Sequence, residues 1–261
     1  MQKTTLIIGV DCAVDEANIG LAIGEYRTGT LDVRDFNSCS WKKPAQVIIA
    51  ERLRGWRARA LLAMDVPLGW PTLLSHSLIK HRAGKKIATE PNNMFRRSTD
   101  RFIKEKLGKK PLDVGADRIA RTAHAALRLL GDLRKCLRIP IPVVWAPASI
   151  IGVTAIEVYP AATLLAHNLM PKNGYKRAEQ IVQRRELVAH LHFISKLNFV
   201  TKTSSLENDA NALDAVVCLL AAKDFQDGRA MPPSNLRLAK REGWIWASDR
   251  TTITSSAGDG K

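Results

Sequence analysis

Long hydrophobic runs are missing from this chain of 261 residues. Its apolar stretches have the length of one strand or one helix, whereas a membrane-spanning helix needs roughly 18–20 apolar residues. Near the N-terminus, Asp11 interrupts the apolar run before the core of a signal peptide could form. We therefore expect a cytoplasmic protein without a membrane segment, long enough to bury a sizeable core.

Cysteine is scarce and scattered, at Cys12, Cys39, Cys136 and Cys218. The sequence contains no C-x-x-C pair and no histidine at zinc-finger spacing from a cysteine. Four free and mostly buried thiols are therefore expected, and neither a disulfide framework nor a zinc site.

Acidic residues are outnumbered by basic ones, with 25 Asp and Glu against 40 Lys and Arg, a net charge of +15 and a pI near 10.0. A surface of this sign attracts polyanions through counterion release and electrostatic steering. A solvated basic surface without a specific partner is the alternative. We weigh nucleic acid above it as the partner class.

Two short apolar segments each end at an aspartate: Thr4–Asp11 and Arg59–Asp65. Their composition is typical of strands buried on both faces. Between them lie two further predicted strands, Asn18–Tyr26 and Thr30–Phe36, and a helix that begins near Pro44. In this β-β-β-α-β order the right-handed crossover rule makes the Asp65 strand a parallel neighbour of the Asp11 strand. Both carboxylates should then lie at the carboxyl edge of the sheet, where open α/β sheets hold their ligands.

These carboxylates are the candidates for a metal site. A single Asp at a strand end commonly caps the next turn, but two on neighbouring strands favour a shared ion. Asp214 is a third candidate, because it borders the apolar face of a helix predicted at Asp209–Phe225, which Asn208 or Asp209 caps. Oxygen ligands without His or Cys suit Mg²⁺ or Mn²⁺, and two such ions roughly 4 Å apart can promote phosphodiester cleavage.

Glu157 is a fourth acidic candidate. It lies in a strand predicted at Gly152–Val158, where Glu is disfavoured unless it faces a site or solvent. Two interpretations of Glu157 are therefore open: it is a catalytic acid, or it is a solvent-facing residue of an edge strand.

We predict that residues 1–250 form one domain with a helical insertion at about 70–141, and that residues 251–261 form a flexible tail. The insertion is rich in basic residues and contains a long amphipathic helix at Gly115–Leu137. Beyond it we predict a strand at Pro142–Ala146, a short helix after Pro160, a longer helix at Tyr175–Leu197 and a possible edge strand in EGWIWAS.

Six segments of the sequence resemble the DUF429 proteins, which are predicted nucleases of the ribonuclease H-like superfamily. They occur in family order and are IIGVD (Ile7–Asp11), AMDVPLGWP (Ala63–Pro71), RRSTDRFIKEKLG (Arg96–Gly108), IEVYPAATL (Ile156–Leu164), ENDANALDAVVCLLAA (Glu207–Ala222) and EGWIWA (Glu242–Ala247). The resemblance implies an α/β fold with a ribonuclease H-like mixed five-stranded sheet, three antiparallel strands followed by parallel ones, flanked by helices.

The resemblance also implies roles for single residues. Metal-binding acids of that superfamily lie on the first strand, the fourth strand and the final helix, places that Asp11, Asp65 and Asp214 occupy. Glu157 matches an additional family acid and is a catalytic candidate. Asp100 matches a family position and is a candidate for substrate binding, although it could simply pair with Arg96 or Arg97 one helical turn away. The basic candidates for substrate binding are Arg96, Arg97, Arg101, Lys104 and Lys176.

The leading hypothesis from the sequence is a nuclease that depends on Mg²⁺ or Mn²⁺ and hydrolyses nucleic acid, with DNA and RNA both open. The first alternative is a nucleic-acid-binding protein of the same fold without catalysis. An actin-like phosphotransferase ranks lowest, because no second glycine-rich phosphate loop is present in the sequence. Oligomeric state is not specified by any of these patterns.

Overall fold

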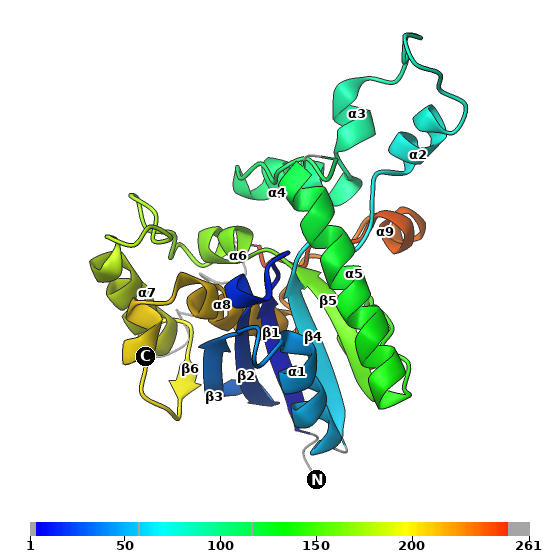
Figure 1. The fold of residues 1–261 in the computed structure, drawn as a ribbon. Coiled ribbons are helices and arrows are strands. Elements are labelled where there is room, and N and C mark those ends of the chain that lie inside the picture. The colour runs from blue at the N-terminus through cyan, green and yellow to red at the C-terminus, as the bar shows by residue number, and fades with distance from the viewer. Residues whose placement is uncertain (1–3, 57, 116, 250–261) are drawn as a thin grey trace.

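A six-stranded mixed sheet forms the centre of the computed structural model, which describes residues 4–56, 58–115 and 117–249. Its strand order is β5-β4-β1-β2-β3-β6 (Figure 1). The strands are β1 (Thr5–Asp11), β2 (Gly20–Arg27), β3 (Thr30–Ser38), β4 (Arg59–Asp65), β5 (Val153–Val158) and β6 (Leu197–Phe199). Strand β2 pairs antiparallel with both β1 and β3, while β4 and β5 run parallel to β1. This confirms the predicted mixed sheet, with one strand more than the five expected.

The additional strand, β6, lies where the sequence predicted the end of a helix at 175–197. Helix α7 (Ile181–Phe193) is shorter at both ends. Lys196 takes a left-handed backbone conformation, with φ of 55°, and this turn lets Leu197 pair with Leu31 of β3. Because α7 starts only at Ile181, Tyr175 and Lys176 belong to a loop.

Helices cover both faces of the sheet (Figure 1). Helices α1 (Ala45–Arg54) and α5 (Asp117–Leu137) bury apolar side chains against one face. Helices α6 (Pro160–Ala166), α7 and α8 (Ala210–Gln226) cover the other face. Among the described helices, none has the length and apolar character required to cross a membrane.

Helix α8 is buried along nearly its whole length and packs on β1 and β2. Gly9 and Gly20 permit this approach, because a methyl group at either position would collide with the backbone carbonyl of Ala215 or Asn211. The close contact brings the first turns of α8, including Asp214, to the end of β1.

The segment between β4 and β5 is largely helical and contains α2 (Thr72–Leu78), α3 (Pro91–Phe95), α4 (Ser98–Leu107) and α5. Helices α2 and α3 stand away from the body of the molecule, above the edge at which β1 and β4 end (Figure 1). The predicted flexible tail at 251–261 lies outside the described residues.

The prediction of a strand at Pro142–Ala146 is wrong. Val143 makes only an isolated bridge to Ala155, and the neighbouring Pro140 and Pro142 have no N–H to donate to a ladder. EGWIWAS likewise forms no strand, although Ile245 makes an isolated parallel bridge to Glu157 at the outer edge of β5. Helix α9 (Leu236–Glu242), capped by the Asn235 side chain, precedes it and was not predicted.

Candidate metal centre

Three carboxylates meet at the carboxyl edge of the sheet. Asp11 and Asp65 end the neighbouring parallel strands β1 and β4 and are in register with each other. Asp214 reaches the same point from α8, and its side chain is almost fully buried. One oxygen of each residue lies within 4.8 Å of the other two. The structure thus brings together the three acids that the sequence proposed as metal ligands.

Burial and mutual repulsion make this cluster unfavourable when all three groups are charged. Burial raises the pKa of Asp11 to about 9, with further contributions from the charges of Asp214 and Asp65. The pKa of Asp65 rises to about 7, again through burial first and then through Asp214. Lys176 offsets part of the repulsion at both groups. A second positive charge would favour the ionised forms of Asp11 and Asp65.

Tyr175 and Lys176 bind the two oxygens of Asp214. The Tyr175 hydroxyl donates a hydrogen bond of 2.5 Å to Oδ1, and the Lys176 ammonium forms an ion pair with Oδ2. Burial alone would lower the pKa of Lys176, but Asp214, Asp11 and Asp65 outweigh it and the pKa is raised. Tyr175 was missed at the sequence level, where its adjacency to Lys176 was the available signal.

The donor set fits a hard divalent cation. All three groups offer carboxylate oxygens, which Mg²⁺ and Mn²⁺ prefer. The adjacent Cys12 is unsuited to bind as a thiolate, because burial and then the charges of Asp65 and Asp11 raise the pKa of its thiol.

Glu157 does not belong to this cluster of three acids and pairs with Arg97 instead. The Arg97 guanidinium pairs with both Glu157 oxygens, at 2.7 and 2.9 Å, and the Leu68 backbone N–H donates to the same carboxylate at 3.0 Å. Glu157 and Arg97 are 2% and 1% exposed. The solvent-facing alternative for Glu157 is therefore wrong, because the side chain is enclosed in a buried ion pair.

Arg97 is almost fully buried, and acids of the protein itself bind its guanidinium. In addition to Glu157 it pairs with Asp100, at 2.8 Å, and donates to the Glu242 carbonyl at 3.2 Å. The pair between Asp100 and Arg97 is the alternative that the sequence left open for Asp100. Both residues, considered for substrate binding from the sequence, lie inside a buried charge network.

The other basic candidates are more accessible. Arg96 pairs with the partly exposed Asp113 at 2.8 Å. Arg101 is exposed and donates to the Arg96 carbonyl, and Lys104 is exposed on α4. Lys176 has a side chain that is 62% exposed although its ammonium group contacts Asp214.

Glu242 is a buried acid that received no role from the sequence. Its two carboxylate oxygens accept the backbone N–H groups of Thr72 and Ser98, each at 2.8 Å. It therefore joins the start of α2 to the start of α4. The EGWIWA motif that contains Glu242 was the only signal available in the sequence.

The profile of the family described as "Protein of unknown function (DUF429)" matches residues 9–237. The chain belongs to the DUF429 family. Among solved structures, T. thermophilus RuvC in complex with a Holliday junction substrate matches with 13% sequence identity and a TM-score of 0.35, over 88% of this chain and 99% of that chain. Among curated proteins, no sequence matches.

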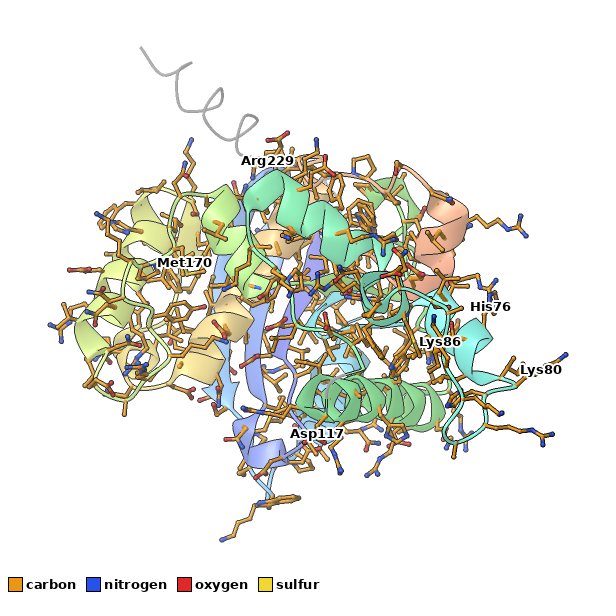
Figure 2. All side chains as sticks on the ribbon, turned by 90° about the horizontal axis from the view of Figure 1, so that it is seen from above. His76, Lys80, Lys86, Asp117, Met170 and Arg229 are labelled. Carbon is orange, nitrogen blue, oxygen red and sulfur yellow. The ribbon has the colours of Figure 1, made fainter. Side chains whose placement is uncertain are left out.

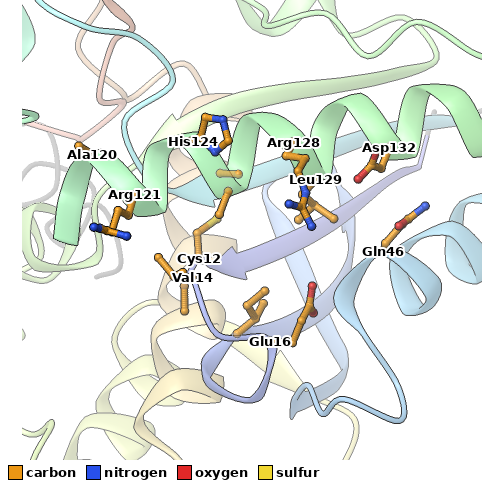
Figure 3. A pocket seen from close by; sticks show the side chains of 14 residues that line it. Cys12, Val14, Glu16, Gln46, Ala120, Arg121, His124, Arg128, Leu129 and Asp132 are labelled. Carbon is orange, nitrogen blue, oxygen red and sulfur yellow. The ribbon is translucent and has the colours of Figure 1, made fainter. Parts of the chain in front are cut away.

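Two cavities lie beside the residue that follows β1 in this DUF429 protein, and Asp65 lines the first of them. One of about 390 Å³ is lined by residues that include Asp65, Glu157, Tyr159, Lys176 and Arg118. The other, of about 480 Å³, lies between α5 and the loop after β1, and Cys12 borders both. Figure 3 shows Arg121 and Arg128 on α5, across the second cavity from Val14 and Glu16. The first cavity therefore offers space beside Asp65 for more than a single phosphate group.

Proposed function

We propose that this protein is a divalent-metal-dependent nuclease that hydrolyses phosphodiester bonds of nucleic acid at Asp11, Asp65 and Asp214. The observation that carries the proposal is the convergence of three carboxylates, from β1, β4 and α8, within 4.8 Å. Such a cluster is unfavourable unless a cation neutralises it. The net charge of +15 supports a polyanionic substrate.

Each group in the site has a proposed task. Asp11, Asp65 and Asp214 would hold Mg²⁺ or Mn²⁺, which when bound activates water and stabilises negative charge on phosphoryl oxygens. Tyr175 orients Asp214 through its hydroxyl. The long and exposed Lys176 side chain can turn from Asp214 to a phosphate of the substrate.

Glu157 is proposed as a positioning residue. Its carboxylate binds Arg97 and the Leu68 N–H, so it holds the loop that follows Asp65. The exposed Arg101 and Lys104 and the partly buried Arg96 are proposed to contact the phosphate backbone, whereas Arg97 is enclosed with Asp100 and Glu157.

We expect cleavage in the presence of Mg²⁺ or Mn²⁺ and none in EDTA when the protein is incubated with single-stranded and double-stranded DNA, RNA, hybrids and branched junctions. The Asp11→Asn/Asp65→Asn variant should lose activity by roughly 10³-fold or more, because it removes several kcal/mol of metal-mediated stabilisation. Gel analysis of labelled substrates measures both results.

The matched control is Asp117→Asn, which removes one carboxylate whose side chain is 77% exposed on α5. It should cleave like the wild type. Cleavage that persists in the double variant would reveal a contaminating nuclease and contradict the proposal. Binding of nucleic acid without cleavage, together with no Mg²⁺ or Mn²⁺ binding by calorimetry, would favour the non-catalytic alternative.

A further inference from the structure

The segment formed by α2, α3 and the loop between them, residues 72–95, is here named the basic arm. Between Asp65 and Glu90 the sequence contains no acidic residue, whereas it contains Lys80, Arg82, Lys85 and Lys86, with two histidines nearby. All four cationic side chains are exposed. Within the described parts of the chain no carboxylate pairs with any of them. The arm therefore has a concentrated positive charge that no carboxylate of the described residues neutralises.

The cations surround a hollow. A cavity of about 400 Å³ is lined entirely by residues of the arm, including the four cations, His81 and the hydroxyl-bearing Ser77 and Thr89. Ser77 and Thr89 join the two sides of the loop through a hydrogen bond of 2.6 Å. Gly84, with φ of 77°, lies in a turn closed by the Lys85 N–H and the Arg82 carbonyl at 3.1 Å. A concave group of cations and hydroxyls suits phosphate oxygens.

The root of the arm is attached to the residues around the metal centre. Glu242 binds the backbone N–H of Thr72, where the arm begins, and that of Ser98, just beyond its end. Arg97 connects the Glu242 carbonyl to Glu157 on β5. Arg97, Glu157 and Asp65 line the same cavity beside the metal centre. The arm thus starts from the site and projects beyond the carboxyl edge of the sheet (Figure 1).

Seen from above that edge, Lys80 extends away from the body of the molecule (Figure 2). Ile79 beside it is 80% exposed. The basic arm is therefore separated from the metal centre, yet it lies on the side from which a substrate would enter.

From these observations we infer that the basic arm binds the phosphate backbone of the nucleic-acid substrate at a distance from the scissile bond. This inference rests on the proposed function, because it makes the arm a second contact for the same substrate. The positive charge of the arm by itself would suit any polyanion. The position of the arm above the edge that holds Asp65 favours a nucleic-acid strand that contacts both. Substrates that extend from the metal centre to the arm should bind more tightly than shorter ones.

The test compares Lys85→Glu/Lys86→Glu with a variant of equal charge change, Arg54→Glu/Lys135→Glu. Arg54 and Lys135 are exposed cations at the C-terminal ends of α1 and α5. Binding of labelled DNA and RNA oligonucleotides of increasing length is measured by fluorescence anisotropy in EDTA at several salt concentrations. Measurement without metal separates this test from the cleavage assay.

We expect the arm variant to bind long oligonucleotides at least about tenfold more weakly than the control variant, with a salt dependence smaller by about two released counterions. The difference should disappear for the shortest oligonucleotides. Unchanged melting temperatures of both variants would exclude unfolding as the cause. Equal affinities of the arm and control variants would overturn the inference. If the arm variant lost binding to phosphatidylserine vesicles but bound nucleic acid as well as the control variant, the inference would be overturned in favour of a membrane surface.

Discussion

Replacement of Arg97 by methionine should lower the free energy of unfolding by about 3–5 kcal/mol, the largest effect we expect from a single substitution in this protein. The guanidinium is buried and pairs with Asp100 and Glu157, which are themselves buried. Without the guanidinium, the buried carboxylates of Asp100 and Glu157 lose the positive charge that offsets their own. Urea denaturation followed by circular dichroism measures the change, and at about 2–4 °C per kcal/mol the melting temperature should fall clearly as well.

Arg96→Met is the matched control, since among the described residues the Arg96 side chain pairs with one acid, the partly exposed Asp113. Its effect should stay within about 1 kcal/mol. Even in the wild type, burial raises the pKa of Glu157 in spite of Arg97. The defect of Arg97→Met should therefore shrink as the pH falls, because Glu157 then becomes protonated. A loss that is equal in both variants, or independent of pH, would contradict the role given to Arg97.

The metal-free protein should lose stability as the pH rises from about 4 toward 9, and Asp11→Asn should reduce this loss. The sign follows from the pKa values of Asp11 and Asp65, which burial and mutual repulsion raise from 3.8 to about 9 and about 7. Across this range the folded state binds more protons than the unfolded state, so stability falls with pH and is fully present only below the unfolded pKa. At pH 8 the variant should be more stable than the wild type by on the order of 2 kcal/mol. Thermal unfolding in EDTA across this pH range measures it.

Adding Mg²⁺ or Mn²⁺ should reverse the order of the two proteins. A ligand that binds only the folded state stabilises the wild type, and the variant that lacks one of the three carboxylates should gain much less. Asp117→Asn should follow the wild type in both conditions. If metal stabilised Asp11→Asn as strongly as the wild type, the assignment of Asp11 as a ligand would fail.

The convergence of Asp11 and Asp65 could be predicted because it depends on short patterns and chain order. An apolar β-branched run that ends at Asp11, a second that ends at Asp65 and one right-handed crossover between them are enough to put both carboxylates at one edge. The strongly apolar composition of α8 similarly shows that Asp214 is next to a buried face.

The environment of Arg97 could not be predicted in this way. Within RRSTD, Arg96 and Arg97 are the same residue type in adjacent positions, and their sequence properties are nearly identical. Only the packing of β5 and α9 against α4 buries one of them among Glu157, Asp100 and the Glu242 carbonyl and leaves the other beside Asp113. These contacts join residues 60 and 145 positions apart.

By itself, the sequence determined the mixed sheet and the meeting of Asp11 and Asp65, since these follow from periodicity and the handedness of a single connection, while the family resemblance added Asp214 to them. Tertiary structure alone decided which charges are buried, where β6 pairs, and where the basic arm projects. The reason is that burial of a charged side chain depends on the sum of contacts from several distant segments. That sum is defined only when the chain has folded.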